Sequence, residues 1–381
     1  MTASTLGRNP ALRIINDITD IPEAEWDALT GGDPFISHAY LHALQASGCA
    51  TAEFGWQPQF ITLWQGNKLV GAMPLYLKMN SYGEHVFDFA WADAYQRHGL
   101  HYYPKLACLV PFAPVTGPRL LATTEKIKGM LLDAALEMAK DTGMSSLHCL
   151  FLNEADVRVA QSRGMMLRQD VQFHWQNNGY RDFDGFLSVL SRDKRKRIKQ
   201  DRRRVQDAGI TLQCITGDAA TEEQWAFFAS CYAYKRQTHY SPPALNDDFF
   251  HRIGASLPQH TLLVIASREG RMIASALNIM TDEVLYGRSW GAFKFHSGLH
   301  FEACFYQAIE FCIARGIKSF EGGSGGEHKL SRGFLPVTTH SAHWLAHPEF
   351  SRAVEDYLQR ESEAVAGYVD ELKEHSPFKK S

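Results

Sequence analysis

An internal repeat restricts the fold of this chain more than any other feature of its sequence. Residues 65–71 match residues 268–274, and residues 141–147 match residues 314–320. In both halves, two β-rich runs joined by a turn precede a helix that ends near a glycine, and another apolar strand follows. We therefore expect an α/β fold of mixed sheets, with two similar units related by internal duplication. Chance similarity between two α/β halves is the alternative.

The length of 381 residues also indicates more than one domain, because a single core stops growing below this size. We expect a first domain over residues 1–180 and a second over residues 181–381. The first copy carries an insert, residues 82–121, that mixes aromatic side chains with polar ones. This composition suits the wall of a pocket for a polar ligand, or a loop that packs its aromatic side chains against the domain.

The composition is that of a soluble globular protein, with 45% apolar and 21% charged residues. No apolar run is long enough to cross a membrane, and the N-terminal residues lack the pattern of a secretory signal. We therefore expect a cytoplasmic protein with no transmembrane segment. The seven scattered cysteines form no Cys-x-x-Cys pair and the histidines lack neighbouring ligands, so we expect reduced thiols and no metal site.

A strongly basic segment lies between the two halves, although the formal net charge of the chain is −3. Residues 192–204 hold nine Lys and Arg against two Asp, and Ile198 and Val205 mark one apolar helix face together with Leu187 and Leu190. Such a basic helix attracts phosphate, whether on RNA, on coenzyme A or on lipid headgroups. A solvated helix that balances an otherwise acidic chain is the alternative. No sequence signature for reading nucleic-acid bases accompanies the segment.

A glycine-rich stretch, residues 319–336, gathers titratable groups directly after a short apolar strand. Glycine leaves the backbone free to bend, so the stretch predicts a site at the end of the second unit. A flexible, solvated loop is the alternative. The residues concerned are Glu321, Gly322, Gly323, Gly325, Gly326, Glu327, His328 and Lys329.

These features together resemble the FemAB-like group of N-acyltransferases, in the branch named for peptidoglycan biosynthesis or recognition. The shared landmarks are the basic segment and residues 91–99, 103–105, 114–119, 298–302 and 314–334. The resemblance implies two tandem GNAT-like domains that transfer an acyl or aminoacyl group to an amine, either a small molecule or a peptidoglycan precursor. The donor would be acyl-CoA, such as acetyl-CoA, or aminoacyl-tRNA, with tRNA bound by the basic helix. The sequence departs from the usual coenzyme A loop at Phe293, where a small residue is expected.

Acyl transfer requires a base for the amine, an oxyanion-stabilising group and a proton for the leaving group. We expect Glu321 or His328 as the base, and Tyr286 or Tyr306 as the proton donor. Glu302 is a further catalytic candidate, although an acidic residue in a first helical turn also suits the helix dipole. Substrate contacts are expected from Asp93, His98, Lys105, Arg288, Trp290, Glu327 and Lys329. Cofactor contacts are expected from Gly322, Gly323, Gly325, Gly326, Arg195 and Lys199.

A non-enzymatic protein is the competing interpretation. The same scaffold, without its chemistry, would bind a muropeptide or RNA. Bound acyl-CoA would favour the enzyme, whereas salt-sensitive tRNA binding without turnover would favour the binding protein.

Overall fold

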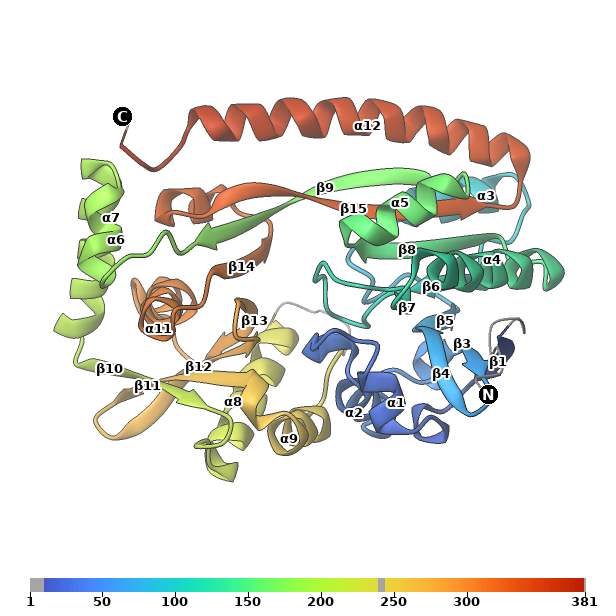
Figure 1. Ribbon diagram of the computed structural model, residues 1–381. Helices are drawn as coiled ribbons and strands as arrows, with labels where there is room; N and C mark the ends of the chain where they lie inside the picture. Colours follow the sequence, from blue (N-terminus) through green and yellow to red (C-terminus); the bar gives the residue numbers. More distant parts are fainter. Residues whose placement is uncertain (1–9, 239–243, 380–381) are drawn as a thin grey trace, which may run out of the picture. The chain divides into compact units, whose positions relative to one another are not determined.

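The computed structural model describes residues 10–238 and 244–379 and divides into two compact units (Figure 1). Unit 1 contains residues 10–170 and Thr339–Ala364, and unit 2 contains Val171–Thr338 and residues 365–379. Each unit is built from two segments of the chain, whereas the sequence predicted one boundary near residue 180. The reason is that three elements run from one unit into the other: β9 (Met166–Gln176), β15 (Leu335–Leu345) and α12 (Pro348–Glu374).

Unit 1 contains two sets of paired strands. One has the order β1-β3-β4-β7, from β1 (Ala11–Ile15), β3 (Phe60–Gln65), β4 (Lys68–Met73) and β7 (Leu121–Ala122). The other has the order β15-β8-β6-β5-β2, with β8 (Ser146–Leu152), β6 (Lys105–Cys108), β5 (Leu75–Lys78) and β2 (Trp56–Pro58). The helices are α1 (Glu23–Asp27), α2 (His38–Ala46), α3 (Phe89–Arg97), α4 (Glu125–Asp141) and α5 (Glu154–Ser162), with short 3-10 turns at Ile18–Asp20, Pro34–Ile36 and Ala52–Phe54.

Unit 2 contains strands in the order β10-β11-β12-β13-β14-β9. They are β10 (Ile210–Thr216), β11 (Thr261–Arg268), β12 (Arg271–Met280), β13 (Val284–Ala292) and β14 (Ser319–Ser324), with β9. The helices are α6 (Phe183–Val189), α7 (Arg192–Asp207), α8 (Glu222–Thr238), α9 (Asp247–Ser256), α10 (Leu299–Phe301) and α11 (Gln307–Arg315). A π-helical turn, η5 (Glu302–Tyr306), joins α10 to α11, and 3-10 turns occupy η4 (Pro258–His260) and η6 (Glu327–Arg332).

The two units repeat the same strand pattern, as the sequence predicted. The antiparallel order β1-β3-β4 in unit 1 corresponds to β10-β11-β12 in unit 2. In each unit a parallel pair follows, β6 with β8 and β13 with β14, and a long helix connects its strands. Because β6 corresponds to β13, residues 82–121 are not wholly an insert. They also contain helix α3, which the sequence analysis missed.

Local sequence signals explain most element boundaries. Gly66 has φ +62° at the β3–β4 turn, the left-handed conformation that the hairpin prediction requires. The Thr124 side chain accepts a hydrogen bond from the Ile127 N–H and so caps α4. The β-rich run at residues 68–77 is divided between β4 and β5 at Pro74, which has no N–H to donate to a neighbouring strand.

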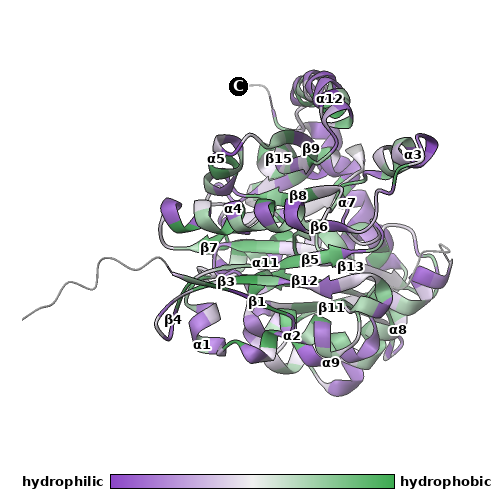
Figure 2. Cartoon of the chain, turned by 90° about the vertical axis from the view of Figure 1, so that its right-hand side faces the viewer, coloured by the Kyte–Doolittle hydropathy of each residue, from purple (hydrophilic) through white to green (hydrophobic). Residues whose placement is uncertain are grey.

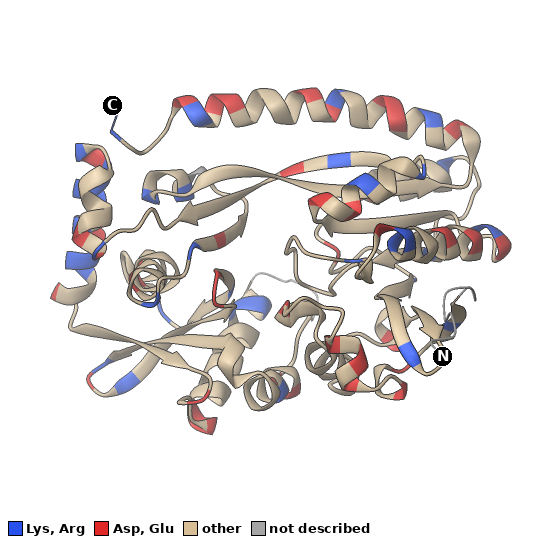
Figure 3. Ribbon diagram, in the orientation of Figure 1, with Lys and Arg blue, Asp and Glu red and all other residues tan. Residues whose placement is uncertain are grey.

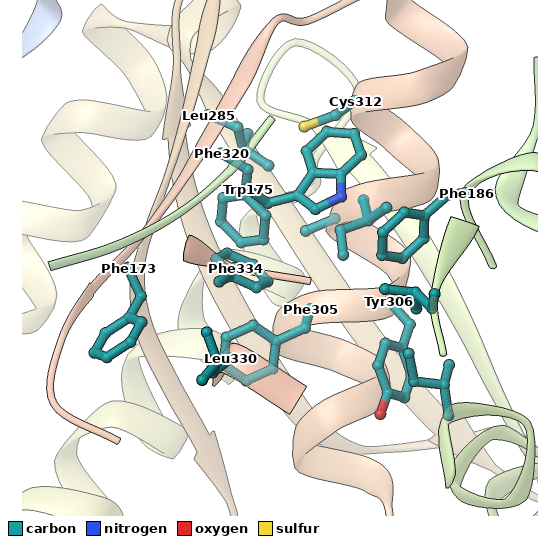
Figure 4. Close-up of a cluster of buried hydrophobic side chains, with 14 of the residues drawn as sticks. Phe173, Trp175, Phe186, Leu285, Phe305, Tyr306, Cys312, Phe320, Leu330 and Phe334 are labelled. Carbon is teal, nitrogen blue, oxygen red and sulfur yellow. The ribbon is translucent and has the colours of Figure 1, made fainter. Parts of the chain in front are cut away.

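Each unit has its own hydrophobic core. The core of unit 2 is rich in aromatic side chains, and Figure 4 shows Phe320, Phe334 and Phe305 beside one another, with ring centroids 5.1 and 5.4 Å apart. The core of unit 1 is built on α4 and includes Leu131, Leu147 and Ile61. Figure 2 shows the corresponding hydrophobic colouring along strands such as β3 and β5, whereas α12 carries many hydrophilic residues. Among the described residues, no helix combines the length and apolar character needed to cross a membrane.

Strand β13 packs so closely on α8 that Gly291 has no room for a side chain. A Cβ at this position would lie 2.2 Å from the Cys231 carbonyl oxygen. We predict that Gly291→Ala lowers the free energy of unfolding by about 1–3 kcal/mol, because the helix or the strand must shift. Gly367→Ala is the matched control, since its Cβ would enter open space in helix α12. This control should raise the stability by about 0.5–1 kcal/mol, and urea denaturation measures both. Equal effects of the two changes would contradict this account of β13.

Candidate functional site

A pocket of about 940 Å³ opens in unit 2 between helix α7, the end of α8 and the loop from β13 to α10. Gly298, in that loop, has φ +86°, and a Cβ there would lie 2.7 Å from the Asp201 carbonyl oxygen of α7. A glycine is therefore required where the loop approaches the helix. The residues that line the pocket are Asp193, Lys196, Arg197, Gln200, Asp201, Arg204, Tyr234, Lys235, Thr238, Trp290, Ala292, Phe293, Lys294, Phe295, His296, Ser297, Gly298, Leu299, His300 and Phe301.

The pocket lining is cationic, with five Lys and Arg against two Asp. Figure 3 shows basic residues recurring along α7, which confirms the predicted basic helix. Ile198 and Val205 are buried, as expected, whereas Leu187 and Leu190 precede α7. Such a surplus of positive charge suits a ligand that carries phosphate groups.

The basic residues expected to bind a cofactor are not the ones that line this pocket. Arg195 instead donates a hydrogen bond to the Ser188 carbonyl oxygen at 3.4 Å, and Lys199 forms an ion pair with Asp184 at 3.5 Å. The pocket-lining positions of α7 are Asp193, Lys196, Arg197, Gln200, Asp201 and Arg204. Their spacing of three and four residues is that of one helix face, although the spacing alone does not tell which face of the helix lines a pocket.

A buried cluster beside the pocket ties α7 to two other segments. The Asp201 carboxylate accepts a hydrogen bond from the Tyr306 hydroxyl at 2.9 Å and pairs with the Arg332 guanidinium at 3.1 Å. Arg332 also donates to the Tyr306 oxygen at 3.0 Å. Burial raises the pKa of Tyr306, and its hydroxyl is already engaged, so this side chain stabilises the site and is a poor proton donor. Asp201 and Arg332 are not among the site residues predicted from the sequence.

Two imidazole rings meet at the edge of the pocket. The His328 ring centroid lies 6.4 Å from that of His300 and 5.7 Å from that of Phe301, both of which line the pocket. Burial lowers the pKa of His300 to about 4, with a smaller contribution from Lys235. Burial, with the positive charges of Lys329 and Arg332, also lowers the pKa of His328. Both rings are therefore neutral at pH 7, and the exposed His328 is able to accept a proton.

The glycine-rich stretch is held in place by Lys329. Its buried ammonium donates to the carbonyl oxygens of Gly323 at 3.2 Å and Ser324 at 3.0 Å, and burial lowers its pKa to about 8. Lys329 therefore fixes the loop and is not placed in the pocket lining as a substrate contact. Gly322 and Gly323 belong to β14, and Gly325 and Gly326 follow it. Glu327 lies in η6, and its side chain is outside the part of the chain that the structure describes.

A second group of predicted residues lies on β13 and β14. These parallel strands are joined by three residue pairs, of which Tyr286 with Glu321 is the last. On its other side, β14 pairs with β9, and there Glu321 is paired with His174. Beyond this point, β13 continues to Ala292 with no further described pair to β14. Arg288 lies on the same continuing part of β13, and Trp290 reaches the pocket. Among the predicted site residues whose side chains the structure describes, Trp290 alone lines the pocket.

Glu302 is buried in the π-helical turn η5 and is not one of the residues that line the pocket. It pairs with Arg202 at 3.1 Å and accepts a hydrogen bond from Gln307 at 2.7 Å. Burial raises its pKa, and Arg202 opposes that shift. These contacts give Glu302 a role in joining η5 to α7, where Arg202 also binds Glu310.

The remaining predicted contacts lie in unit 1. Asp93 and His98 are exposed on or next to helix α3. Lys105 is fully buried and pairs with Glu84 at 2.8 Å and with Asp88. Burial alone would lower the pKa of Lys105, but the two carboxylates raise it overall. Lys105 is therefore enclosed by its own ion pairs in the described structure, and the expectation of a direct substrate contact is not supported by this geometry.

The comparison of sequences assigns the family. A family model described as peptidoglycan biosynthesis/recognition matches residues 17–380, and the chain belongs to this FemAB-like family. The resemblance inferred from the sequence is thereby confirmed. Among curated proteins, no sequence is similar enough to count as a relative.

Solved structures support the same fold. FemX is 11% identical to this chain, and the match covers 88% of this chain and 98% of FemX with a TM-score of 0.55. L-PGS from Bacillus licheniformis is 10% identical, and the match covers 94% of this chain and 99% of that protein with a TM-score of 0.53. At these identities the likeness establishes the fold, an α/β arrangement of two repeated units, and no finer property. No group of three or more His, Cys, Asp or Glu that could hold a metal occurs among the described residues.

The ion pairs of Lys105 give a direct test of its structural role. We predict that Lys105→Met lowers the free energy of unfolding by about 3–5 kcal/mol, because Glu84 and Asp88 would be left without their buried partner. Lys318→Met is the matched control, since Lys318 pairs with Glu283 in an exposed position. That change should cost less than about 1 kcal/mol. Urea denaturation compares the two variants, and a Lys105 variant as stable as the control would return Lys105 to the candidates for substrate contact.

Proposed function

We propose that this protein is an N-acyltransferase of the FemAB-like type, which transfers an acyl or aminoacyl group from a phosphate-bearing donor to an amine. The acceptor is a small-molecule amine or an amine of a peptidoglycan precursor. One observation supports this proposal above the others: a cationic pocket of unit 2 lies beside a neutral, exposed imidazole, that of His328. The family assignment supports the same class of reaction. A cytoplasmic location stays a prediction of the sequence.

The proposed reaction uses the basic residues that line the pocket and the imidazole of His328 beside it. The amine nitrogen attacks the donor carbonyl carbon, a C–N bond forms, and the C–S bond of a thioester or the C–O bond of an ester breaks. His328 takes the proton that the amine loses and then gives a proton to the leaving sulfur or oxygen, which returns the imidazole to its neutral form. The phosphate groups of the donor are bound by Lys196, Arg197 and Lys235. Arg204 also lines the pocket, but its guanidinium lies 3.8 Å from the Asp201 carboxylate and pairs with it.

The proposal assigns different tasks to the other predicted residues. Glu321 and Tyr286 remain candidates for contact with the acceptor or the leaving group, since they stand where β13 and β14 cease to pair. Lys329 and the glycines fix the backbone on which His328 stands. Acyl-CoA and aminoacyl-tRNA both carry the phosphate groups that the pocket suits, so the choice between them belongs to experiment.

Charge reversal on α7 tests the pocket as the donor site. We predict that the double variant Lys196→Glu/Arg197→Glu weakens binding of the true donor. The affinity should also depend less on salt, with a slope smaller by about one unit for each phosphate group that the helix no longer binds. The matched control is Lys199→Glu/Arg203→Glu, which makes the same charge change on the same helix, outside the pocket lining. Binding is measured with acyl-CoA and aminoacyl-tRNA in turn.

The outcomes separate the alternatives. Weaker binding in the pocket pair alone supports the assigned site, and the ligand that is affected identifies the donor. Equally weak binding in both pairs would show that the helix attracts the ligand without using this pocket. Transfer to amine acceptors is followed by mass spectrometry. A protein that binds a donor but transfers its group to no acceptor would favour the non-catalytic binding protein.

The imidazole of His328 provides a test of the chemistry. We predict that His328→Ala lowers kcat by about 10²- to 10⁴-fold while the donor Kd changes little, because the variant loses the base but keeps the cationic residues. The pKa of His328 lies below its ordinary value of 6.5. The rate of the unaltered enzyme should therefore decrease with falling pH only below pH 6.5, where His328 gains a proton and can no longer act as a base. His375→Ala, a change at an exposed histidine after α12, is the control. Unchanged turnover in His328→Ala would exclude His328 as the base.

A further inference from the structure

The loop between β13 and α10 exposes aromatic rings to solvent to an unusual degree. Phe295 is 91% exposed, and Phe293, two residues before it, is 40% exposed. The Phe293 ring lies 5.2 Å from that of Tyr234, which is also 40% exposed. We call residues 293–297 the aromatic loop. A phenylalanine so fully in water gains nothing from folding, so its placement calls for a ligand or a surface that covers it.

Positive charge surrounds these rings. Lys294 stands between the two phenylalanines, and Lys235 lies near the end of α8, where it also lines the pocket. The basic positions of α7 complete the same surface. Aromatic rings flanked by lysines suit the interface of a bilayer that contains anionic lipids, where rings enter the headgroup region and ammonium groups pair with phosphates.

The exposure of Phe295 distinguishes this use from base stacking. A nucleobase that stacks on a ring covers only the face that it contacts. Phe295, at 91% exposure, has both faces open to solvent. A bilayer surrounds an inserted ring on all sides, so it covers such a side chain more completely than a base does.

We propose that the aromatic loop docks unit 2 on anionic lipid bilayers, with Phe295 inserted among the headgroups and Lys294 paired with lipid phosphates. The contact is peripheral and reversible, since one loop with two phenylalanines supplies little apolar area. It weakens at high ionic strength because the lysine contribution is screened. This inference does not depend on the transfer reaction proposed above.

Vesicle binding by the full chain tests the proposal. We expect co-sedimentation with vesicles of phosphatidylcholine mixed with phosphatidylglycerol, and much weaker binding to vesicles of phosphatidylcholine alone. Phe295→Ser should weaken binding to the mixed vesicles by about ten-fold or more, as expected for one aromatic ring removed from an apolar environment. Phe54→Ser is the matched control, because Phe54 is 53% exposed in unit 1, next to the acidic Glu53. This control should bind as the unaltered protein does.

A fluorescent reporter adds a measurement that folding defects do not imitate. Because the chain already has eight tryptophans, the unaltered protein is the reference, and Phe295→Trp should add a blue shift of tryptophan emission on addition of the mixed vesicles and none with phosphatidylcholine alone. Equal binding to both kinds of vesicle, no binding to either, or full binding by Phe295→Ser would each overturn the proposal. It would also be overturned if Phe295→Ser weakened binding of acyl-CoA or tRNA in the absence of vesicles and left vesicle binding unchanged, since the loop would then belong to the donor site.

Discussion

The buried guanidinium of Arg332 is the interaction on which the site in unit 2 depends. It pairs with Asp201 of α7, donates to Tyr306 of η5 and to the His328 carbonyl oxygen at 2.7 Å, and stacks 3.3 Å above the Phe301 ring. A charged group removed from water is tolerated only when its hydrogen bonds are made, so these partners must stay together. One side chain thereby fixes the basic helix, the pocket wall and the backbone of the candidate base.

Close packing also orders the glycine-rich stretch, for which a flexible loop was the alternative interpretation of the sequence. Gly326 has φ +92°, and a Cβ there would lie 2.2 Å from the His328 ring. The ring can occupy its position only because residue 326 is a glycine. Lys329 then holds the preceding carbonyl oxygens. Glycine here serves a defined backbone conformation, and two buried cations, Lys329 and Arg332, keep that conformation in place.

The sequence predicted elements that rest on local signals and failed where the answer lies in packing. The duplication, the β3–β4 hairpin and the basic helix follow from turn residues, periodicity and charge, and the structure contains all three. To predict that Arg197 and not Lys199 lines the pocket, one must know how α7 is rotated about its axis. That rotation depends on contacts such as the ion pair of Asp201 with Arg332. Lys105 was predicted to contact a ligand because it lies in a stretch rich in aromatic residues. Its carboxylate partners are Glu84 and Asp88, and their spacing in the sequence does not identify them as partners.

Corresponding positions of the two units differ in their exposure. His148 and Glu321 occupy the same position in the two copies, because Leu147 pairs with Leu106 as Phe320 pairs with Leu285. In unit 1 this position is sealed: His148 is 1% exposed, and burial, with the positive charge of Lys105, lowers its pKa to about 3. In unit 2, Glu321 is half-buried at the point where the parallel strands stop pairing. A reacting group must reach its substrate, so this contrast between the two copies supports the proposal that the reaction takes place in unit 2.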